Sequence, residues 1–143
     1  MSPEDFRDHL LDDDDRAGAA HLTSVTGHEA HDALLVLGSG LAEMADDLGS
    51  ADATLRLSDL PGVIAPTADG HLDELRSIVV AGAGGSEVDD GGAPIRVLVA
   101  LGRTHLYEGV ERRPVTALVR AAAAAGVTRA VLTNANGSLR DWA

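Results

Sequence analysis

The sequence contains no cysteine and no lysine, and it has one tryptophan, one tyrosine and one phenylalanine in 143 residues. Without cysteine the chain has no disulfides and no thiolate metal ligands, and we expect a cytoplasmic location. All 11 basic residues are arginine, against 23 acidic ones, and the formal net charge is −12. This acidity argues against nucleic acid as a partner, so any bound anion must be held by a local pocket.

Long apolar runs are also missing. None approaches the roughly 18 residues that a membrane-spanning helix needs, so we expect no membrane partner. The acidic N-terminus, MSPEDFRDHLLDDDD, lacks the apolar segment of a secretory signal. With 45% hydrophobic residues, the chain is expected to fold as a single domain over residues 1–143.

What the sequence does contain is an alternation of apolar runs and helical patterns. Strands are predicted over residues 33–40, 75–82 and 95–102 and in RAVLTNANG, and helices over 17–25 and 114–126. This order predicts an α/β fold with a mixed, substantially parallel sheet flanked by helices. The run Asp12–Asp15 is interpreted as a solvated face or loop.

Three of the predicted strands end in polar loops. These are Gly38-Ser39-Gly40, Arg103-Thr104-His105 and Asn134-Ala135-Asn136. Ligands of open sheets with parallel strands bind beyond the carboxyl ends of the strands. The three loops therefore indicate a ligand site.

The first loop, GSG, exposes backbone N–H groups at the start of a helix, where an anion is favoured and the Ser39 hydroxyl can add a hydrogen bond. It is not a dinucleotide fingerprint, because Glu43 occupies the third glycine position, and a P-loop would need a lysine. A tight strand-to-helix turn without a ligand is an equally good interpretation.

The second loop, GRTHLYEG, carries more chemistry. Arg103 offers a planar fork for a phosphate, and His105 points to the same side of an extended chain, where it can donate a second bond. Tyr107 supplies a flat wall suited to a sugar ring. The alternative is structural: an internal ion pair between Arg103 and Glu108, with His105 as a hydrogen-bonded core histidine.

A metal site is not expected. His28 and His31 lie three residues apart, which excludes the HExxH spacing of zinc proteases. No third ligand is apparent for a generic metal site.

The segments LGSGL, GRTHLYEG and LTNANGSL resemble, in order and approximate spacing, the motifs of the trimeric purine nucleoside phosphorylases. The resemblance extends from about Leu34 to Leu139, and the GR-x-H-x-YEG block is its most specific part. Members of that family continue well beyond the third motif. The resemblance therefore implies the N-terminal portion of a purine/uridine phosphorylase-like fold, incomplete at the C-terminus.

The resemblance also implies roles for individual residues. The implied phosphate ligands are Ser39, His71, Arg103, His105 and the backbone N–H of Ala135. Tyr107 would contact the ribose, and His105 and Glu108 would be catalytic, Glu108 as an orienting partner of the phosphate-binding cluster. The chain departs from the family pattern at four positions: Leu72, Asp73, Asn136 and Ser138.

The activity implied by the resemblance is phosphorolysis of purine (2′-deoxy)ribonucleosides to free base and pentose 1-phosphate, a purine salvage reaction. Inorganic phosphate is the co-substrate, and neither a metal nor an organic cofactor is implied. The implied partners are the nucleoside, phosphate and, at full length, two further copies in a homotrimer. Phosphate attacks the anomeric carbon through an oxocarbenium-like transition state, as water does in glycoside hydrolysis.

The purine is held in this family by a Glu/Asn pair further along the chain, so base specificity is not readable here and the 143 residues alone are expected to be inactive. Two alternatives stay open. One is a methylthioadenosine phosphorylase-like enzyme, and the other is a truncated, non-catalytic phosphate-binding domain.

Overall fold

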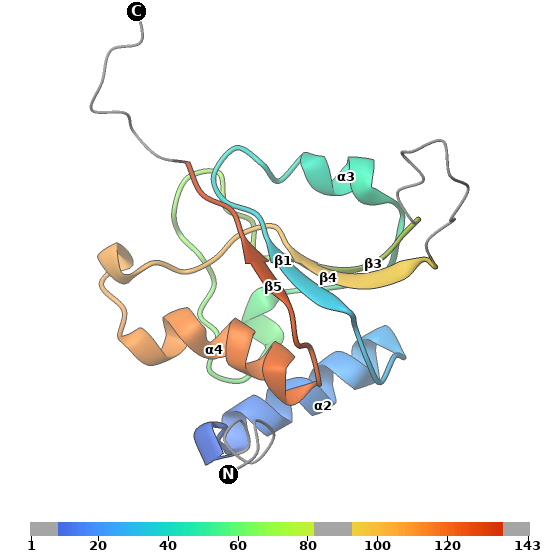
Figure 1. Cartoon of the computed structure of the whole chain (residues 1–143). Coiled ribbons are helices and arrows are strands. Elements are labelled where there is room, and N and C mark those ends of the chain that lie inside the picture. Colours follow the sequence, from blue (N-terminus) through green and yellow to red (C-terminus); the bar gives the residue numbers. More distant parts are fainter. Residues whose placement is uncertain (1–8, 82–92, 136–143) are drawn as a thin grey trace, which may run out of the picture.

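The computed structural model describes residues 9–81 and 93–135, which form a mixed sheet between helices (Figure 1). The strands in these ranges are β1 (Ala33–Val36), β2 (Ala51–Leu55), β3 (Leu75–Val80), β4 (Ile95–Ala100) and β5 (Ala130–Leu132). The helices are α2 (Asp13–Thr26), α3 (Met44–Leu48) and α4 (Arg112–Ala124), with two short 3₁₀ turns, η1 (Leu57–Asp59) and η2 (Leu106–Glu108). None of these helices is long and apolar enough to cross a membrane.

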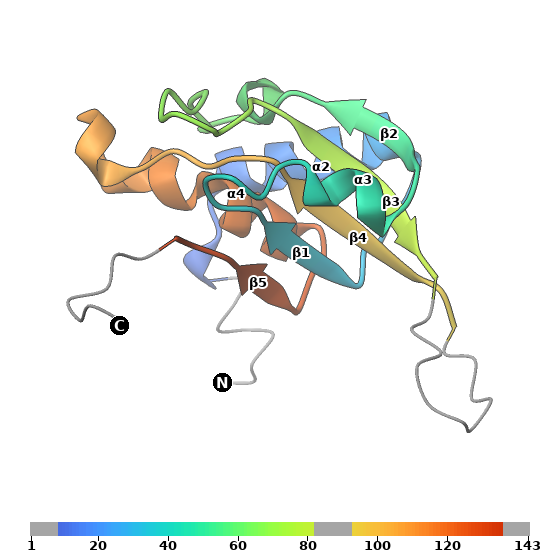
Figure 2. The same ribbon diagram turned by 90° about the horizontal axis from the view of Figure 1, so that it is seen from above.

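The strand order is β2-β3-β4-β1-β5 (Figure 2). β1 pairs in parallel with both β4 and β5, whereas β3 pairs antiparallel with β2 and β4. The predicted mixed sheet is confirmed. Its parallel half consists of the three strands that the polar loops follow.

Each face of the sheet is covered by helices, as Figure 1 shows. Leu34 and Val36 of β1 pack in one apolar cluster with Leu22 of α2 and Leu118 of α4. On the other face the cluster contains Ala45 of α3, together with residues of β3 and β4. The strand alternation that places successive side chains on opposite faces thus builds two cores on one sheet.

The predicted strands and helices are confirmed with shifted ends. The apolar run at 33–40 forms only a four-residue strand, and the helix predicted over 114–126 begins at Arg112. Pro114 is tolerated in the first turn of α4, because an N–H there has no partner within the helix. β2 is not predicted, since its sequence, ADATL, buries only Leu55.

The interpretation of Asp12–Asp15 as a solvated run is wrong at its last residue. Asp12 caps α2 and accepts a hydrogen bond from the backbone N–H of Asp15 at 3.0 Å. Asp15 begins the buried face of the helix and is 1% exposed. A carboxylate so deep needs cationic partners.

Those partners come from α4, about a hundred residues along the chain. Nη2 of Arg113 donates to Asp15 at 2.6 Å, and Nη2 of Arg120 lies 2.8 Å from the other carboxylate oxygen. Removing one partner of a buried ion pair is strongly destabilising. Asp15 therefore joins α2 to α4.

Candidate functional site

The carboxyl ends of β1, β4 and β5 meet at one edge of the sheet because the three strands are parallel. The backbone N–H of Gly38 donates to Oγ1 of Thr133 at 2.9 Å, and that hydroxyl donates to the carbonyl of Val36 at 3.1 Å. A Cβ at position 38 would lie 2.8 Å from the Thr133 carbonyl oxygen, so a side chain there would push the two loops apart. The first and third motifs are thus in direct contact.

Arg103, after β4, connects the second motif to the third. Its Nη1 donates to the Thr133 carbonyl at 2.8 Å. Within residues 9–81 and 93–135, Nε and Nη2 of Arg103 donate to no protein group. This partly buried guanidinium keeps one two-donor edge for a ligand.

His71 is brought to the same edge by backbone pairing. The N–H of Leu72 donates to the Leu101 carbonyl at 3.1 Å, and the N–H of Leu101 donates to the Glu74 carbonyl at 2.9 Å. A Cβ at Gly102 would lie 2.7 Å from the Leu72 carbonyl oxygen and 2.9 Å from Cβ of His71. Only glycine at position 102 lets the His71 segment lie against the end of β4.

Asp73, one of the departures from the family pattern, anchors this segment from the other side. Its carboxylate accepts hydrogen bonds from the backbone and hydroxyl of Ser58 at 2.8 and 2.6 Å, and from Nε of Arg56 at 3.0 Å. Burial by itself would raise the pKa of Asp73, but these hydrogen bonds outweigh it and hold the pKa below its usual value. The substitution fixes the loop that carries His71.

The His71 ring contacts three of the predicted site residues. Nδ1 lies 2.9 Å from the backbone N–H nitrogen of Arg103, and Nε2 lies 2.9 Å from Oγ of Ser39 and 3.5 Å from Nε2 of His105. Burial, and then the nearby His105 and Arg103, lower the pKa of His71, which Glu108 opposes. The ring is neutral at pH 7.

His105 lies between His71 and Tyr107. Its ring meets that of His71 edge to face, with centroids 5.0 Å apart, and stacks on that of Tyr107 at 4.7 Å with 14° between the planes. Tyr107 is 75% exposed. Its ring is an open apolar surface beside the polar cluster.

The alternative ion pair between Arg103 and Glu108 is wrong. Glu108 accepts hydrogen bonds from the backbone N–H and the hydroxyl of Thr67, both at 2.6 Å, and from the backbone N–H of His105. Burial alone would raise the pKa of Glu108, but these hydrogen bonds lower it. Its carboxylate is occupied with the loop at Thr67 and the start of η2, and not with Arg103.

Two threonines in the motifs were not singled out in the sequence. Thr133 bridges the first and third motifs as described, and Thr104 is buried and donates to the Ile64 carbonyl at 2.6 Å. Their neighbours Arg103 and Asn134 had drawn attention to these loops. The hydrogen-bond partners of both threonines lie far away along the chain, so neither residue carries a local signal of its own.

The third motif is described only in part. Ala135 is exposed and lies two residues beyond Thr133, at the same edge of the sheet. Asn136 and Ser138, the departures in this motif, lie outside the described residues.

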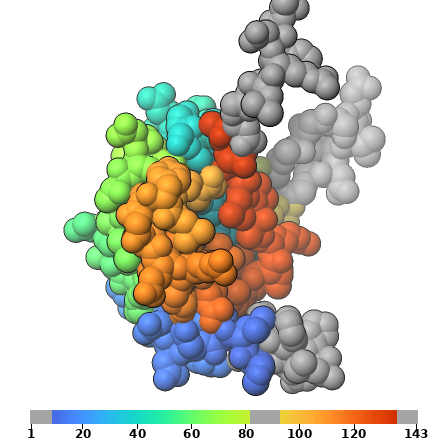
Figure 3. All heavy atoms as spheres, turned by 90° about the vertical axis from the view of Figure 1, so that its left-hand side faces the viewer, coloured from blue at the N-terminus to red at the C-terminus, as the bar shows by residue number. Residues whose placement is uncertain are grey.

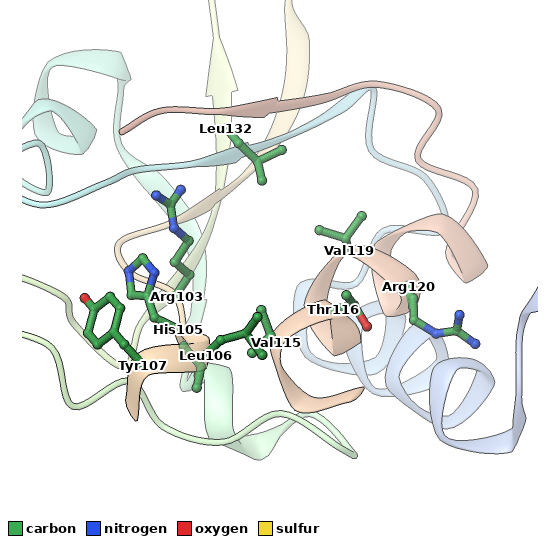
Figure 4. Close-up of a pocket in the computed structure, with 10 residues that line it drawn as sticks. Arg103, His105, Leu106, Tyr107, Val115, Thr116, Val119, Arg120 and Leu132 are labelled. Carbon is green, nitrogen blue, oxygen red and sulfur yellow. The ribbon is translucent and has the colours of Figure 1, made fainter. Parts of the chain in front are cut away.

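A cavity of about 860 Å³ adjoins the cluster (Figure 4). Arg103, His105 and Tyr107 form one wall, and apolar side chains of α4 and β5 face them, among them Val115, Val119 and Leu132. Figure 3 views the face where the segments from η2 to α4, in orange, adjoin β5, in red. The volume is in the range of small-molecule sites.

The other histidine pair lies at the opposite edge of the sheet. Nε2 of His28 lies 3.2 Å from the Asp52 carboxylate, and Nε2 of buried His31 lies 3.1 Å from Oγ of Ser77. Arg96 donates to both Asp52 and Ser77. In the part of the chain that the structure describes, no three His, Asp, Glu or Cys side chains converge as a metal site.

No protein-family model matches the chain. Its sequence is 44% identical over 129 residues to the purine nucleoside phosphorylase of Cellulomonas sp, covering 89% of this chain and 43% of that relative. It is 42% identical over 125 residues to the purine nucleoside phosphorylase of Mycobacterium tuberculosis, covering 87% of this chain and 42% of the relative. The chain thus spans about two fifths of the length of these curated relatives.

Solved structures agree. The purine nucleoside phosphorylase of Schistosoma mansoni in complex with acetate matches with a TM-score of 0.63 at 23% identity, covering 87% of this chain and 41% of that one. A purine nucleoside phosphorylase in complex with ribose-1-phosphate matches with a TM-score of 0.61 at 25% identity, covering 85% and 39%. These matches confirm the fold class, and the curated relatives confirm the resemblance drawn from the motifs.

Proposed function

We propose that this chain forms the phosphate- and ribose-binding part of a purine nucleoside phosphorylase, which cleaves purine (2′-deoxy)ribonucleosides with inorganic phosphate. One observation carries the proposal. At a single edge of the sheet, Ser39, His105 and the backbone of Arg103 all contact the His71 ring, and among the described residues the Arg103 guanidinium keeps two donors free. The carboxylate of Glu108, in the same loop, is bound elsewhere. Converging donors without a counter-ion suit an anion.

The phosphate would be held by groups from all three loops. Arg103 supplies the two-donor edge, and Ser39 and His105 supply single hydrogen bonds. The backbone N–H of Ala135 supplies a further one from the third loop. Because the net charge of −12 repels anions at long range, this local set of donors has to supply the affinity.

The sugar would lie against Tyr107, whose exposed ring is stacked on His105. A phosphate oxygen then attacks the anomeric carbon, the bond from that carbon to the purine nitrogen breaks, and its electron pair leaves with the base. Positive charge that develops on the sugar is stabilised by the adjacent phosphate, and holding the two together supplies proximity. Glu108 acts as a positioning residue, since it fixes the His105 backbone and the loop at Thr67.

The remaining parts of the proposal come from the resemblance. Phosphate is the co-substrate without a metal or organic cofactor, and the full-length protein works as a cytoplasmic homotrimer. The groups that bind the purine belong to chain beyond these two fifths of the relatives' length. We therefore expect the 143 residues to show no phosphate-dependent release of hypoxanthine from inosine in a coupled oxidation assay, and robust turnover would contradict this division of labour.

The test of the phosphate site is a titration of the chain with inorganic phosphate, followed by calorimetry or by NMR of the backbone amides. Arg103→Gln is expected to weaken phosphate binding about ten- to a hundredfold, because a charge-assisted hydrogen-bonded contact is worth about 1.5–3 kcal/mol. Arg103→Lys should recover only part of this, since a point charge lacks the planar fork.

The matched control is Arg129→Gln, which removes the same charge from an exposed position just before β5. It should leave phosphate binding within about twofold, since Arg129 is exposed and precedes β5, whereas the site follows the carboxyl end of that strand. An unchanged affinity in a folded Arg103→Gln variant would contradict the assignment.

A further inference from the structure

The His71 ring has both of its nitrogens in hydrogen-bonding contact, and one of the two contacts can run in one direction only. Nδ1 lies 2.9 Å from the backbone nitrogen of Arg103, whose N–H is always a donor. Nδ1 is therefore the acceptor and carries no proton. A neutral imidazole has one N–H, so in His71 the proton is on Nε2.

The state of Nε2 decides what Ser39 does. An Nε2–H donates to the Ser39 oxygen at 2.9 Å, whereas His105 at 3.5 Å is too far for a strong bond. The Ser39 hydroxyl then cannot give its own proton to His71 and must direct it elsewhere. This is the reverse of a serine–histidine pair in which the histidine takes the serine proton, so Ser39 is not an activated nucleophile.

We infer that His71 is a positioning residue, locked by the Arg103 backbone as the neutral Nε2–H tautomer, which orients Ser39 so that its hydroxyl donates to phosphate. The inference rests on the proposed function for the identity of the anion. His71 is then not a direct phosphate ligand, as the resemblance implied, but the residue that orients the ligand Ser39. The anchoring by Gly102 and Asp73 serves this role, since the ring must meet two partners at once.

The charges around His71 keep it in this state. Arg103 and His105 face it as positive or potentially positive groups, and Glu108 is the acidic group that opposes them. The Glu108 carboxylate is taken by Thr67 and by the His105 backbone. Protonating His71 would place a proton on Nδ1 against the Arg103 N–H and break that contact. The ring would then no longer be held in the position from which Nε2 meets Ser39.

The tautomer can be read directly by long-range ¹⁵N–¹H NMR of the imidazole nitrogens in the 143-residue chain. We expect His71 to show a bare Nδ1 and a protonated Nε2 at pH 7, and to titrate below the usual histidine range. An Nδ1–H tautomer, or an imidazolium at pH 7, would overturn the inference. This readout needs no phosphate.

A pair of variants separates the two contacts of the ring. His71→Asn keeps an oxygen near the position of Nδ1 for the Arg103 N–H but is too short to reach Ser39. His71→Gln can place its amide near the position of Nε2. We expect His71→Asn to weaken phosphate binding about fivefold, as does Ser39→Ala, and His71→Gln to recover part of the loss.

Both changes remove the same contribution, the Ser39 hydroxyl held in place by His71. The double variant of His71→Asn and Ser39→Ala should therefore bind phosphate about as well as either single variant. Additive losses would mean that His71 contacts phosphate independently, and would overturn the inference while leaving the phosphate site standing. A wild-type chain with the expected tautomer but without phosphate affinity would overturn the proposed function. It would also overturn the inference that the Ser39 hydroxyl donates to phosphate.

Discussion

Arg96 lies near the start of β4 and Arg103 follows its end, and each belongs to a cluster with a serine and a histidine. Arg96 shares Ser77 with His31, and the backbone of Arg103 holds His71, which contacts Ser39. At the Arg96 end the arginine already has a carboxylate partner, because Asp52 accepts hydrogen bonds from both Arg96 and His28. At the Arg103 end the carboxylate of Glu108, in the same loop, accepts hydrogen bonds from Thr67, and Arg103 keeps free donors.

The difference teaches that residue types alone do not mark a binding site. Burial opposes ionisation of Asp52, yet hydrogen bonds from Arg96, Ser77 and His28 lower its pKa to about 2. A carboxylate stabilised in this way neutralises the cations around it. The set at Arg103 lacks such a partner among the described residues, so it can take its negative charge from a ligand.

The largest expected effect is a pH dependence of the stability, which comes from His31 in the cluster around Arg96 and Asp52. Burial, and then Arg96 and His28, lower the pKa of His31 from 6.5 to about 4. Above pH 6.5 the residue is neutral in both folded and unfolded chains. Between pH 6.5 and pH 4 only the unfolded chain takes up the proton, so the free energy of unfolding should fall by about 3 kcal/mol.

Urea unfolding at pH 7 and at pH 4.5 measures this loss. His31→Gln should remove the larger part of the pH dependence, because glutamine does not titrate in this range, and His71, whose pKa is also lowered, should account for a remainder. His21→Gln should leave the pH dependence in place. A pH dependence that is undiminished in His31→Gln would show that another group is responsible.

The next prediction compares the loss of each arginine in turn. Arg96→Gln removes the main partner of Asp52, whose side chain is 38% exposed, and should lower the free energy of unfolding by about 1 kcal/mol, with phosphate affinity unchanged. Arg103→Gln should show the converse, a large loss of phosphate affinity and at most about 1 kcal/mol of stability for its bond to Thr133.

Denaturation and phosphate titration of the Arg96→Gln and Arg103→Gln variants test this contrast. Equal losses of stability, with no difference in phosphate affinity, would mean that both ends of β4 are merely structural.

A smaller effect is expected at Glu108. Glu108→Gln weakens hydrogen bonds to Thr67 and to the His105 backbone and should cost about 1 kcal/mol of stability. Since this carboxylate is not the counter-ion of Arg103, phosphate affinity should change by less than about twofold, a shift of under half a kcal/mol. A marked tightening of phosphate binding in this variant would indicate that Glu108 does neutralise the cluster.

The smallest effect on stability is expected at Tyr107, which is 75% exposed. Tyr107→Ala should change the free energy of unfolding by less than about 0.5 kcal/mol. It should leave phosphate affinity unchanged but weaken binding of ribose 1-phosphate, and Tyr107→Phe separates the ring from its hydroxyl. Parallel calorimetric titrations with the two ligands provide the measurement, and equal affinities in wild type and Tyr107→Ala would remove the ribose assignment.

Much of the fold is visible in the sequence because it is written in local apolar patterns. The strands at 33–36, 75–80 and 95–100 are apolar runs, and α4 has a clear apolar stripe. β2 was missed because four of its five side chains are at least partly exposed, so nothing in its pattern resembles a core strand. Its antiparallel pairing with β3 depends on contacts that no local pattern records.

The site was predictable to the extent that its residues follow strand ends. Ser39, Arg103 and His105 could be expected to meet once the strands were taken as parallel. The occupation of Glu108 by Thr67, 41 residues away, could not be foreseen. Asp15 was misread for the same reason, because its partners Arg113 and Arg120 lie about a hundred residues further on.

The backbone pairing of residues 71–74 with the end of β4 has a thermodynamic consequence. Because Gly102 and Asp73 hold this segment in place before any anion arrives, binding does not have to order a loop, and little conformational entropy is lost. The affinity of the site then depends on how well its fixed donors replace the hydration shell of the incoming anion. A bulkier residue at position 102 would not touch the anion, but it would push residues 71–72 away from the end of β4. Anion binding would then have to order this segment, and the affinity would fall by that cost.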